Sequence, residues 1–310
     1  MTVLGIVRFA GKWVFYYIIV PLVRYIPVSI AYKLATILGV INYYLFKENR
    51  KIIRQNMKEV LKGKSDREIE RLVKLNFINH AKANVEIILL PKIDEKLLAQ
   101  RLDFHGFENI EEALKRGRGI IFSLGHMGIY YLAGAITNMK GCVMNDIAQD
   151  VAQLKAGRIE KKMLMKKLNT YKKVISGKII HKDKQLDLLL EIIRILKKNE
   201  GISLFIDAKP NQTDPVIEFL GKKTYISSGT AAIAMRTGCA IIPNVTLRMP
   251  GNRWYIRAEK SVEITKTGNT EEDLKKALTK CTDFLEKYIL EYPEQWHHWR
   301  VFHQRWVRDE

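Results

Sequence analysis

Short apolar runs alternate with helical patterns along most of this chain, and that alternation limits the folds open to it. Three runs have the length and composition of buried strands, at 120–124, 202–206 and 240–245. The longest helical patterns around them cover 152–168, 184–198 and 271–290. Because strands that alternate with helices form largely parallel sheets, we predict a single α/β domain with a mainly parallel sheet flanked by helices. The chain has 310 residues, of which 47% are hydrophobic, enough for one substantial core.

Local signals place further elements around this core. Ser65 and Glu68 form a capping box, and the helical pattern that it opens continues until Pro91 stops it. Additional strands are expected at 142–144, 174–175, 216–220 and 254–258, with helices opening near Gly128 and Ser228. No repeat of fixed period is present.

The N-terminal region carries two apolar stretches, 13–23 and 34–46, each too short to cross a bilayer comfortably. Both are rich in aromatic residues and flanked by basic ones, which is typical of a membrane interface. We predict an uncleaved membrane-associated helical element at 1–46, either interfacial or spanning with a tilt, followed by the α/β domain at 47–310. Two buried core helices and a signal peptide remain alternatives. Basic residues after Phe46 favour the cytoplasmic side of the inner membrane.

The charge balance points to an anionic partner. The chain has 52 basic and 33 acidic residues, a net charge of +19. Nucleic acid, bilayer phosphates or an acidic carrier protein would each fit, and a lysine-rich proteome would also explain the excess. No nucleic-acid-reading module is present, so we predict no nucleic-acid partner. One basic cluster, Lys161, Lys162, Lys166 and Lys167, is either a solvated helix face or a docking site for a carrier or lipid head groups.

Two other classes of site find little support. The cysteines, Cys142, Cys239 and Cys281, lie far apart and lack zinc-ligand spacing. The histidines near the C-terminus, His297, His298 and His303, are interleaved with bulky aromatic residues and have no carboxylate pair at ligand spacing, so we predict no metal. Gly117 and Gly119 belong to no nucleotide-binding fingerprint.

One histidine stands where ligands bind in such folds. The strand 120–124 runs into Gly125, His126, Met127 and Gly128 before a helix, which puts the imidazole at the carboxyl end of a parallel strand. The two glycines would allow a ligand to approach closely. A histidine there is suited to take a proton from a hydroxyl, although a lone histidine is more often structural.

Longer stretches of the chain carry a family pattern. The line 104–135 contains Gly106-x-Glu108-Asn109 and Gly117-Arg118-Gly119 ahead of the Gly-His-x-Gly run. The stretch 219–243, the pair Ile206-Asp207 and the ending at 292–296 (YPEQW) continue it. Together these segments resemble the lysophospholipid acyltransferase superfamily, and within it the late (lauroyl/myristoyl) acyltransferases of lipid A biosynthesis, over nearly the whole chain.

The resemblance implies an acyltransferase that moves a fatty acyl chain from acyl-CoA or an acyl carrier protein to a hydroxyl of a lipid A precursor, a glycolipid or a lysophospholipid, with no cofactor. His126 would be the general base, and an acidic residue five positions later would orient it. Tyr131 stands at that position instead. A neutral phenol cannot offset charge on an imidazolium, and loss of the comparable carboxylate in a Ser-His-Asp triad costs roughly 10⁴ in rate.

Three interpretations follow from Tyr131: a weak or specialised enzyme, an enzyme that uses another acid, or an inactive lipid-binding relative. The candidate acids are Asp146, Glu86 and Asp207, and Asp207 is attractive because it also follows a strand. The candidate catalytic residues are therefore His126, Tyr131 and Asp207. The candidate substrate-binding residues are Gly125, Gly128, Arg116, Arg118, Lys209, Ser228, Gly229 and Thr230.

Overall fold

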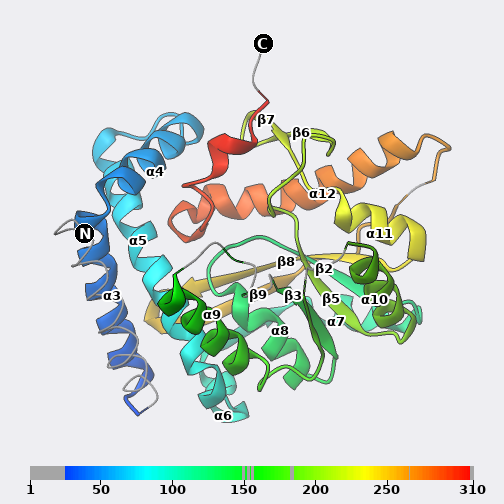
Figure 1. Cartoon of the computed structure of the whole chain (residues 1–310), viewed down its shortest axis with the longest axis horizontal. Coiled ribbons are helices and arrows are strands. Elements are labelled where there is room, and N and C mark those ends of the chain that lie inside the picture. The colour runs from blue at the N-terminus through cyan, green and yellow to red at the C-terminus, as the bar shows by residue number, and fades with distance from the viewer. Residues whose placement is uncertain are drawn as a thin grey trace.

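A seven-stranded sheet forms the centre of the molecule (Figure 1). The computed structural model describes residues 25–148, 151, 154, 157–181, 185–264 and 266–307. The sheet has the order β1-β9-β8-β2-β5-β3-β4, and every neighbouring pair is parallel except β8 with β9. Its strands are β1 (Leu102–His105), β2 (Ile120–Leu124), β3 (Met144–Ala148), β4 (Ile179–His181), β5 (Gly201–Phe205), β8 (Ala240–Met249) and β9 (Arg253–Ala258). The predicted α/β fold with a mainly parallel sheet is confirmed.

The central strand β2 is buried along its whole length, as its uninterrupted apolar run requires. It pairs with β5 on one side and β8 on the other, and Leu124 lies opposite Phe205 and Asn244. The carboxyl ends of β2 and β5 therefore coincide. As a result, the residues that follow the two strands, His126 and Asp207, emerge at the same edge of the sheet.

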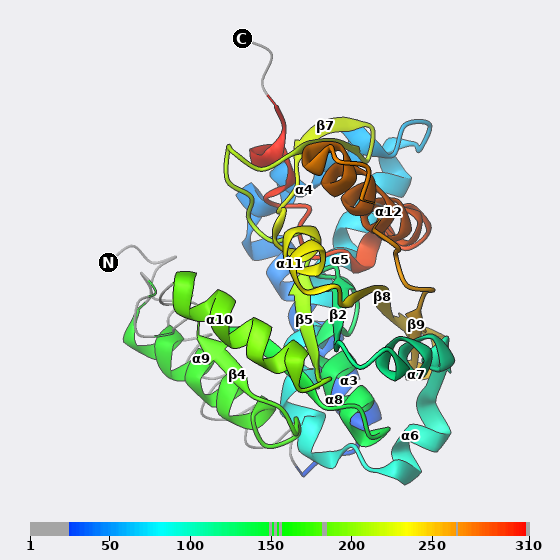
Figure 2. The ribbon, with the colours of Figure 1, turned by 90° about the vertical axis from the view of Figure 1, so that its right-hand side faces the viewer.

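Helices cover both faces of the sheet (Figure 2). Ile121 and Ile202 pack toward α10 (Gln185–Lys197), α11 (Gly229–Thr237) and α12 (Thr270–Glu291). Ile120 and Phe122, which alternate with Ile121 along β2, pack toward α7 (Phe107–Lys115) and α8 (Tyr130–Met139). Outside the sheet, β6 (Val216–Phe219) and β7 (Lys222–Tyr225) form an antiparallel hairpin, and α6 (Glu95–Arg101) and α9 (Arg158–Tyr171) complete the domain.

Helices α3, α4 and α5, which precede the first strand, form a side layer. The long helix α5 (Asp66–Leu89) begins at the Ser65–Glu68 capping box and gives way at Pro91 to a short 3₁₀ turn, as predicted. Helix α3 (Val28–Leu45) packs along α5, and α4 (Lys47–Val60) follows it. The contact between α3 and α5 is close: a Cβ at Gly39 would lie 2.4 Å from the Cα of Ile78.

The opposite face of α3 is apolar and exposed. Ile30, Leu34, Ile37, Ile41 and Tyr44 recur along it at helical spacing. Within the described ranges, α3 is the one helix long and apolar enough to cross a membrane, with a mean hydropathy of 1.3 over 18 residues. The other predicted apolar stretch, 13–23, lies outside the described residues.

Three local predictions were wrong. The helix expected at 152–168 is α9 at Arg158–Tyr171, and the described residues 151, 154 and 157 ahead of it are not helical. Residues 174–175 were expected to form a strand, but they lie in the turn after α9, and the strand is β4 at Ile179–His181. Ile175 is apolar because it is buried in a hydrophobic cluster with Ile136 and Tyr171. The strand expected at 142–144 begins only at Met144, since Cys142 is part of the approach to the sheet.

Candidate active site

A histidine and an aspartate from neighbouring strands meet at the carboxyl edge of the sheet. Nδ1 of His126 lies 2.7 Å from Oδ1 of Asp207, and the backbone N–H of His126 donates to Oδ2 of the same carboxylate at 2.8 Å. Because the carboxylate only accepts, Nδ1 carries the proton and Nε2 is the basic nitrogen. The His126 side chain is 24% exposed, so a ligand can reach it, whereas Asp207 is buried at 1%.

The ring of His126 is held on both faces. Phe205 stacks on one side, with ring centroids 4.1 Å apart and planes inclined by 25°. His298 stacks at 4.1 Å and 24°. Tyr130 meets the ring edge-on at 5.3 Å. These contacts fix the plane of the imidazole, and with it the direction of Nε2.

The Asp207 carboxylate is surrounded by donors. Nε1 of Trp296 donates to Oδ2 at 2.8 Å, in addition to the two bonds from His126. Burial by itself raises the pKa of Asp207, but His126 and His298, with Arg305 nearby, hold it below its usual range. The group is therefore a carboxylate at neutral pH, able to stabilise positive charge on His126.

His298 supports the pair from the C-terminal end of the chain. Nδ1 of His298 lies 2.9 Å from the backbone carbonyl oxygen of Asp207 and 2.7 Å from the Arg305 guanidinium. Burial lowers the pKa of His298 to about 3, against the opposing pull of Asp207, so the ring is neutral at pH 7.

The segment 293–299 is fastened beside the His126 loop by backbone bonds. The N–H of His297 donates to the carbonyl of His126 at 2.8 Å, and the N–H of Gly128 donates to the carbonyl of Gln295 at 2.9 Å. The side chain of Asn76 on α5 donates to the carbonyl of Trp296 at 2.8 Å. These bonds hold the C-terminal segment against the His126 loop.

Two further histidine contacts extend this network. Nε2 of His297 donates to the carbonyl of Gly128 at 3.3 Å, so its Nδ1 accepts from Nδ1 of His80 at 3.0 Å. Burial lowers the pKa of His80 to about 4 and that of His297 well below its ordinary value. Both rings are consequently neutral.

The other two candidate acids, Asp146 and Glu86, bind residues other than His126. Asp146, on β3, accepts a hydrogen bond from the Tyr171 hydroxyl at 2.6 Å. Glu86 is paired with Arg248 in a buried ion pair, with Oε2 2.6 Å from Nη2. Of the three carboxylates considered from the sequence, the structure places Asp207 against His126.

Tyr131 does not take the place of the missing acid. Its ring packs on Tyr130, with centroids 4.0 Å apart, and Tyr130 is the residue that touches His126. Burial raises the pKa of Tyr131, so the phenol stays neutral. Tyr131 instead contributes to the wall of the cavity beside the histidine.

The glycines of the motif accommodate protein rather than ligand. A Cβ at Gly125 would lie 2.4 Å from a methyl of Leu285, and one at Gly128 would lie 2.1 Å from the carbonyl oxygen of Thr246. Gly128 also has a φ of +56°, which disfavours other residues. Close packing of α12 and β8 therefore accounts for both positions.

The remaining substrate-binding candidates are not gathered at His126. Arg116 and Arg118 precede β2, at the opposite end of the strand, and Arg116 pairs with Glu263 at 2.9 Å. Lys209 is exposed two residues after Asp207. Ser228 donates to Asp214 at 2.6 Å at the start of α11, where Gly229 and Thr230 follow.

A cavity of about 450 Å³ lies in front of the His126 ring. Its walls come from α3, α4 and α5 on one side and from the His126 loop and C-terminal segment on the other. Phe46, Phe77, Tyr130 and Tyr131 supply aromatic surface, and Arg300 supplies a positive charge. The cavity thus joins the histidine to the apolar helix α3.

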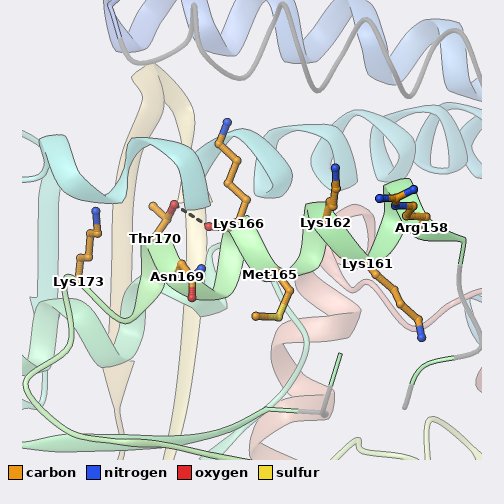
Figure 3. Close-up of a pocket in the computed structure, with 8 residues that line it drawn as sticks. All are labelled: Arg158, Lys161, Lys162, Met165, Lys166, Asn169, Thr170 and Lys173. Atoms are coloured by element: carbon orange, nitrogen blue, oxygen red, sulfur yellow. Dashed lines mark hydrogen bonds between the residues drawn. The ribbon is translucent and has the colours of Figure 1, made fainter. Parts of the chain in front are cut away.

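A larger hollow of about 720 Å³ follows the basic face of α9 (Figure 3). Figure 3 shows Lys162 and Lys166 extending to one side of the helix and Lys161 to the other. The lining includes Arg158, Lys161, Lys162, Lys166 and Lys173 and no acidic residue of the described chain. This face is suited to an anionic partner.

His126, Asp207 and His298 are close enough to suggest a metal centre, with donor atoms within 4.8 Å of one another. Their contacts fit hydrogen bonding better. His126 and Asp207 are at direct hydrogen-bond distance, both carboxylate oxygens already accept bonds, and the two imidazoles stack almost in parallel. The arrangement is suited to proton transfer.

Sequence reasoning missed His298, Arg305 and Trp296 as parts of the site. His298 was considered only as a metal ligand. The match of 292–296 to a family ending was the one signal that this segment belongs near His126.

Fold and site together define an α/β protein whose sheet edge presents a histidine–aspartate pair beside an amphiphilic cavity. The chain belongs to the bacterial lipid A biosynthesis acyltransferase family, whose sequence model matches residues 3–308. It is 23% identical over 260 residues to a phosphatidylinositol mannoside acyltransferase of Mycolicibacterium smegmatis, covering 83% of this chain and 79% of the relative. A phosphatidylinositol mannoside acyltransferase of Mycobacterium tuberculosis is 21% identical over 227 residues, covering 72% of this chain and 66% of the relative.

Proposed function

We propose that the protein transfers a fatty acyl group from a thioester to a hydroxyl of a phosphate-bearing glycolipid, with His126 as general base and Asp207 as its partner. The observation that carries this proposal is the hydrogen bond between His126 and Asp207 at the mouth of the cavity. It supplies the carboxylate that Tyr131 does not.

The reaction follows from the protonation states. Nε2 of His126 takes the proton of the acceptor hydroxyl as its oxygen attacks the thioester carbonyl carbon. The tetrahedral intermediate collapses to the ester, the C–S bond breaks, and the imidazolium returns the proton to the leaving thiolate. Asp207 stabilises the imidazolium between these two steps.

The acceptor class is inferred from the family and its relatives. The family description names lipid A biosynthesis, and the two mycobacterial relatives are named for a mannosylated phosphoinositide. Both kinds of lipid present a sugar hydroxyl near a phosphate. A lysophospholipid is the alternative acceptor, and acyl-CoA or an acyl carrier protein is the donor.

The proposed location is the cytoplasmic face of the inner membrane. Two surfaces support this location. One is the exposed apolar face of α3, a helix that also lines the cavity through Asn42, and the other is the basic face of α9. A lipid lying against α3 would have a short path to His126.

An acyl-transfer assay tests the proposal. The purified full chain in detergent micelles is given each donor with a lipid A precursor, a phosphatidylinositol mannoside or a lysophospholipid. We expect ester formation with a glycolipid, reduced by roughly 10² to 10⁴ in His126→Ala. Absence of transfer with every combination, or full activity of His126→Ala, would show that the protein is a lipid-binding relative without this chemistry.

A further inference from the structure

A histidine of α5 shares the active-site cavity with His126. The His80 side chain is half-buried and lines that cavity. A row of ring contacts joins the two histidines. His80 meets His297 with ring centroids 4.2 Å apart, and His297 meets Tyr130 at 5.5 Å. Tyr130 in turn meets His126 at 5.3 Å, so a ligand that has one hydroxyl at His126 finds His80 in the same chamber.

The hydrogen bonds of His80 determine which of its nitrogens is free. The carbonyl of Gly128 only accepts, so Nε2 of His297 carries a proton, and Nδ1 of the neutral His297 ring accepts from Nδ1 of His80. Burial lowers the pKa of His80 to about 4, and the charge of Arg300 acts in the same direction. The neutral His80 ring therefore has a lone pair on Nε2.

This nitrogen is open to a ligand. No donor among the described residues bonds Nε2 of His80, and it is not one of the atoms that the protein encloses without a partner. Since Nδ1 is turned to His297 and the half-buried ring lines the cavity, Nε2 is the polar atom that His80 offers there.

A neutral imidazole nitrogen with a free lone pair selects a hydrogen-bond donor. A phosphate dianion has no proton to donate, whereas a hydroxyl has one. A sugar carries several hydroxyls, so one can lose its proton to His126 while a second donates to His80. A lysophospholipid such as lysophosphatidylcholine has one free hydroxyl, and that hydroxyl is the one acylated.

Two amides line the same cavity from the helices beside α5. Asn42 of α3 and Asn49 of α4 stand on either side of Phe46, and all three residues line the cavity. Both asparagines are half-buried, and no described residue hydrogen-bonds either side-chain amide. An amide both donates and accepts, as sugar hydroxyls do. An aromatic wall with a few polar groups is the usual composition of a small-molecule site.

We propose that His80 recognises the sugar of the acceptor. Its Nε2 accepts a hydrogen bond from a second sugar hydroxyl, and Asn42 and Asn49 bond other hydroxyls of the ring, while His126 acts on the first. The inference rests on the proposed function and deepens it, because it selects a glycolipid over a lysophospholipid as the acceptor.

Equilibrium binding without an acyl donor tests this site. The full chain, in polyoxyethylene detergent micelles that carry no sugar, is titrated with octyl mannoside, octyl glucoside and 2-octyloxytetrahydropyran, an ether ring without hydroxyls. We expect at least one hexoside to bind more tightly than the ether. His80→Asn should weaken binding of that hexoside about fivefold to tenfold, the loss of one neutral hydrogen bond, and leave binding of the ether unchanged.

Matched variants separate sugar recognition from a structural role of His80. An asparagine amide reaches the place of Nδ1 in a histidine, and a glutamine amide reaches the place of Nε2. His80→Asn therefore keeps a donor toward His297 and loses the acceptor in the cavity, whereas His80→Gln keeps that acceptor and should retain most of the hexoside affinity. A purely structural role, through the bond to His297, predicts the reverse order. His105→Asn makes the same change at an exposed position outside the cavity and should bind as the parent does.

The inference is overturned if neither hexoside binds more tightly than the ether, if His80→Asn binds the hexoside as tightly as the parent, or if it weakens hexoside and ether equally. Should His80→Asn fail to fold, Asn49→Ala decides: it should weaken hexoside binding alone, and unchanged binding overturns the site. Acyl transfer is measured separately. A protein that transfers no acyl group can therefore still show the sugar site, and an active one can lack it.

Discussion

At the residue scale, the most informative feature is the sandwich that holds His126. Phe205 and His298 both stack on the imidazole at 4.1 Å, while Asp207 bonds its Nδ1. A general base works only when its lone pair is aimed at the proton that it removes. The two stacked rings fix the orientation of the imidazole, and the Asp207 carboxylate fixes its tautomer by accepting a hydrogen bond from Nδ1.

Replacement of His298 tests the role of stacking. His298→Ala removes one face of the sandwich and should lower kcat about tenfold to hundredfold with little change in KM, because misplacement of the base affects the chemical step. His298→Phe keeps the stacked ring and should restore most of kcat. Steady-state kinetics with both variants measures the difference, and equal losses in the two would contradict a positioning role for the ring.

The sequence indicated the partnership of Asp207 with His126 but not the position of His298. Asp207 was among three possible acids because it follows a strand, and the pairing of β2 with β5 brings it to His126. His298 was not recognised, because its segment has no periodicity that reveals where it packs. Its place is set by long-range bonds from Asn76, on α5, and from the His126 loop.

At the element scale, a buried ion pair joins three parts of the fold. Arg248 of β8 pairs with Glu86 of α5, and the Tyr32 hydroxyl of α3 donates to the same carboxylate at 2.7 Å. Gln295 of the C-terminal segment bonds the backbone of Arg248 in both directions. The apolar helix α3 and the C-terminal segment therefore both form hydrogen bonds to the Arg248–Glu86 pair of residues.

Breaking this ion pair should be costly. Arg248→Met leaves Glu86 charged and buried, which we expect to lower the free energy of unfolding by about 3–5 kcal/mol. Adding Glu86→Gln removes the orphaned charge and should recover part of the loss. Denaturant unfolding of the single and double variants gives both values. A single variant as stable as the parent would show that the pair does not hold these elements together.

Most elements of the fold followed from local pattern, and the failures share a cause. The strand 120–124 was predicted to the residue because a buried central strand is uniformly apolar. The edge strand β4 was misplaced because its three residues are half-buried and the apolar pair nearby, at 174–175, fills a loop instead. An apolar residue in the sequence indicates that the position is buried, but a buried position can lie in a loop as well as in a strand.

At the scale of the whole molecule, buried neutral histidines link stability to pH. The folded protein holds the pKa of His80 at about 4 and that of His298 at about 3, each through burial, against about 6.5 in an unfolded chain. The unfolded state therefore binds more protons below pH 6.5. Stability should be full above that value and should fall as the pH drops toward 4.

The size of this effect can be checked with one variant and a control. Each such histidine contributes a slope of about 1.4 kcal/mol per pH unit between its folded and unfolded pKa values. His80→Asn should flatten the pH dependence of the unfolding free energy between pH 6.5 and 4.5 by about that slope. Lys172→Asn, at an exposed site, should leave it unchanged. An unaltered slope in His80→Asn would contradict the neutral state of His80.

The proposed role of His126 as a general base depends on Asp207 serving as the acid that position 131 does not provide. Acyl transfer is measured for the parent, Asp207→Asn, Tyr131→Phe and Tyr131→Glu under one set of conditions. The structure predicts that Asp207→Asn lowers kcat by roughly 10³ to 10⁴, the loss seen when a histidine base is deprived of its carboxylate. Tyr131→Phe should be nearly neutral and Tyr131→Glu should bring no gain. An active Asp207→Asn variant, or strong activation by Tyr131→Glu, would contradict the pairing of His126 with Asp207 as the catalytic dyad.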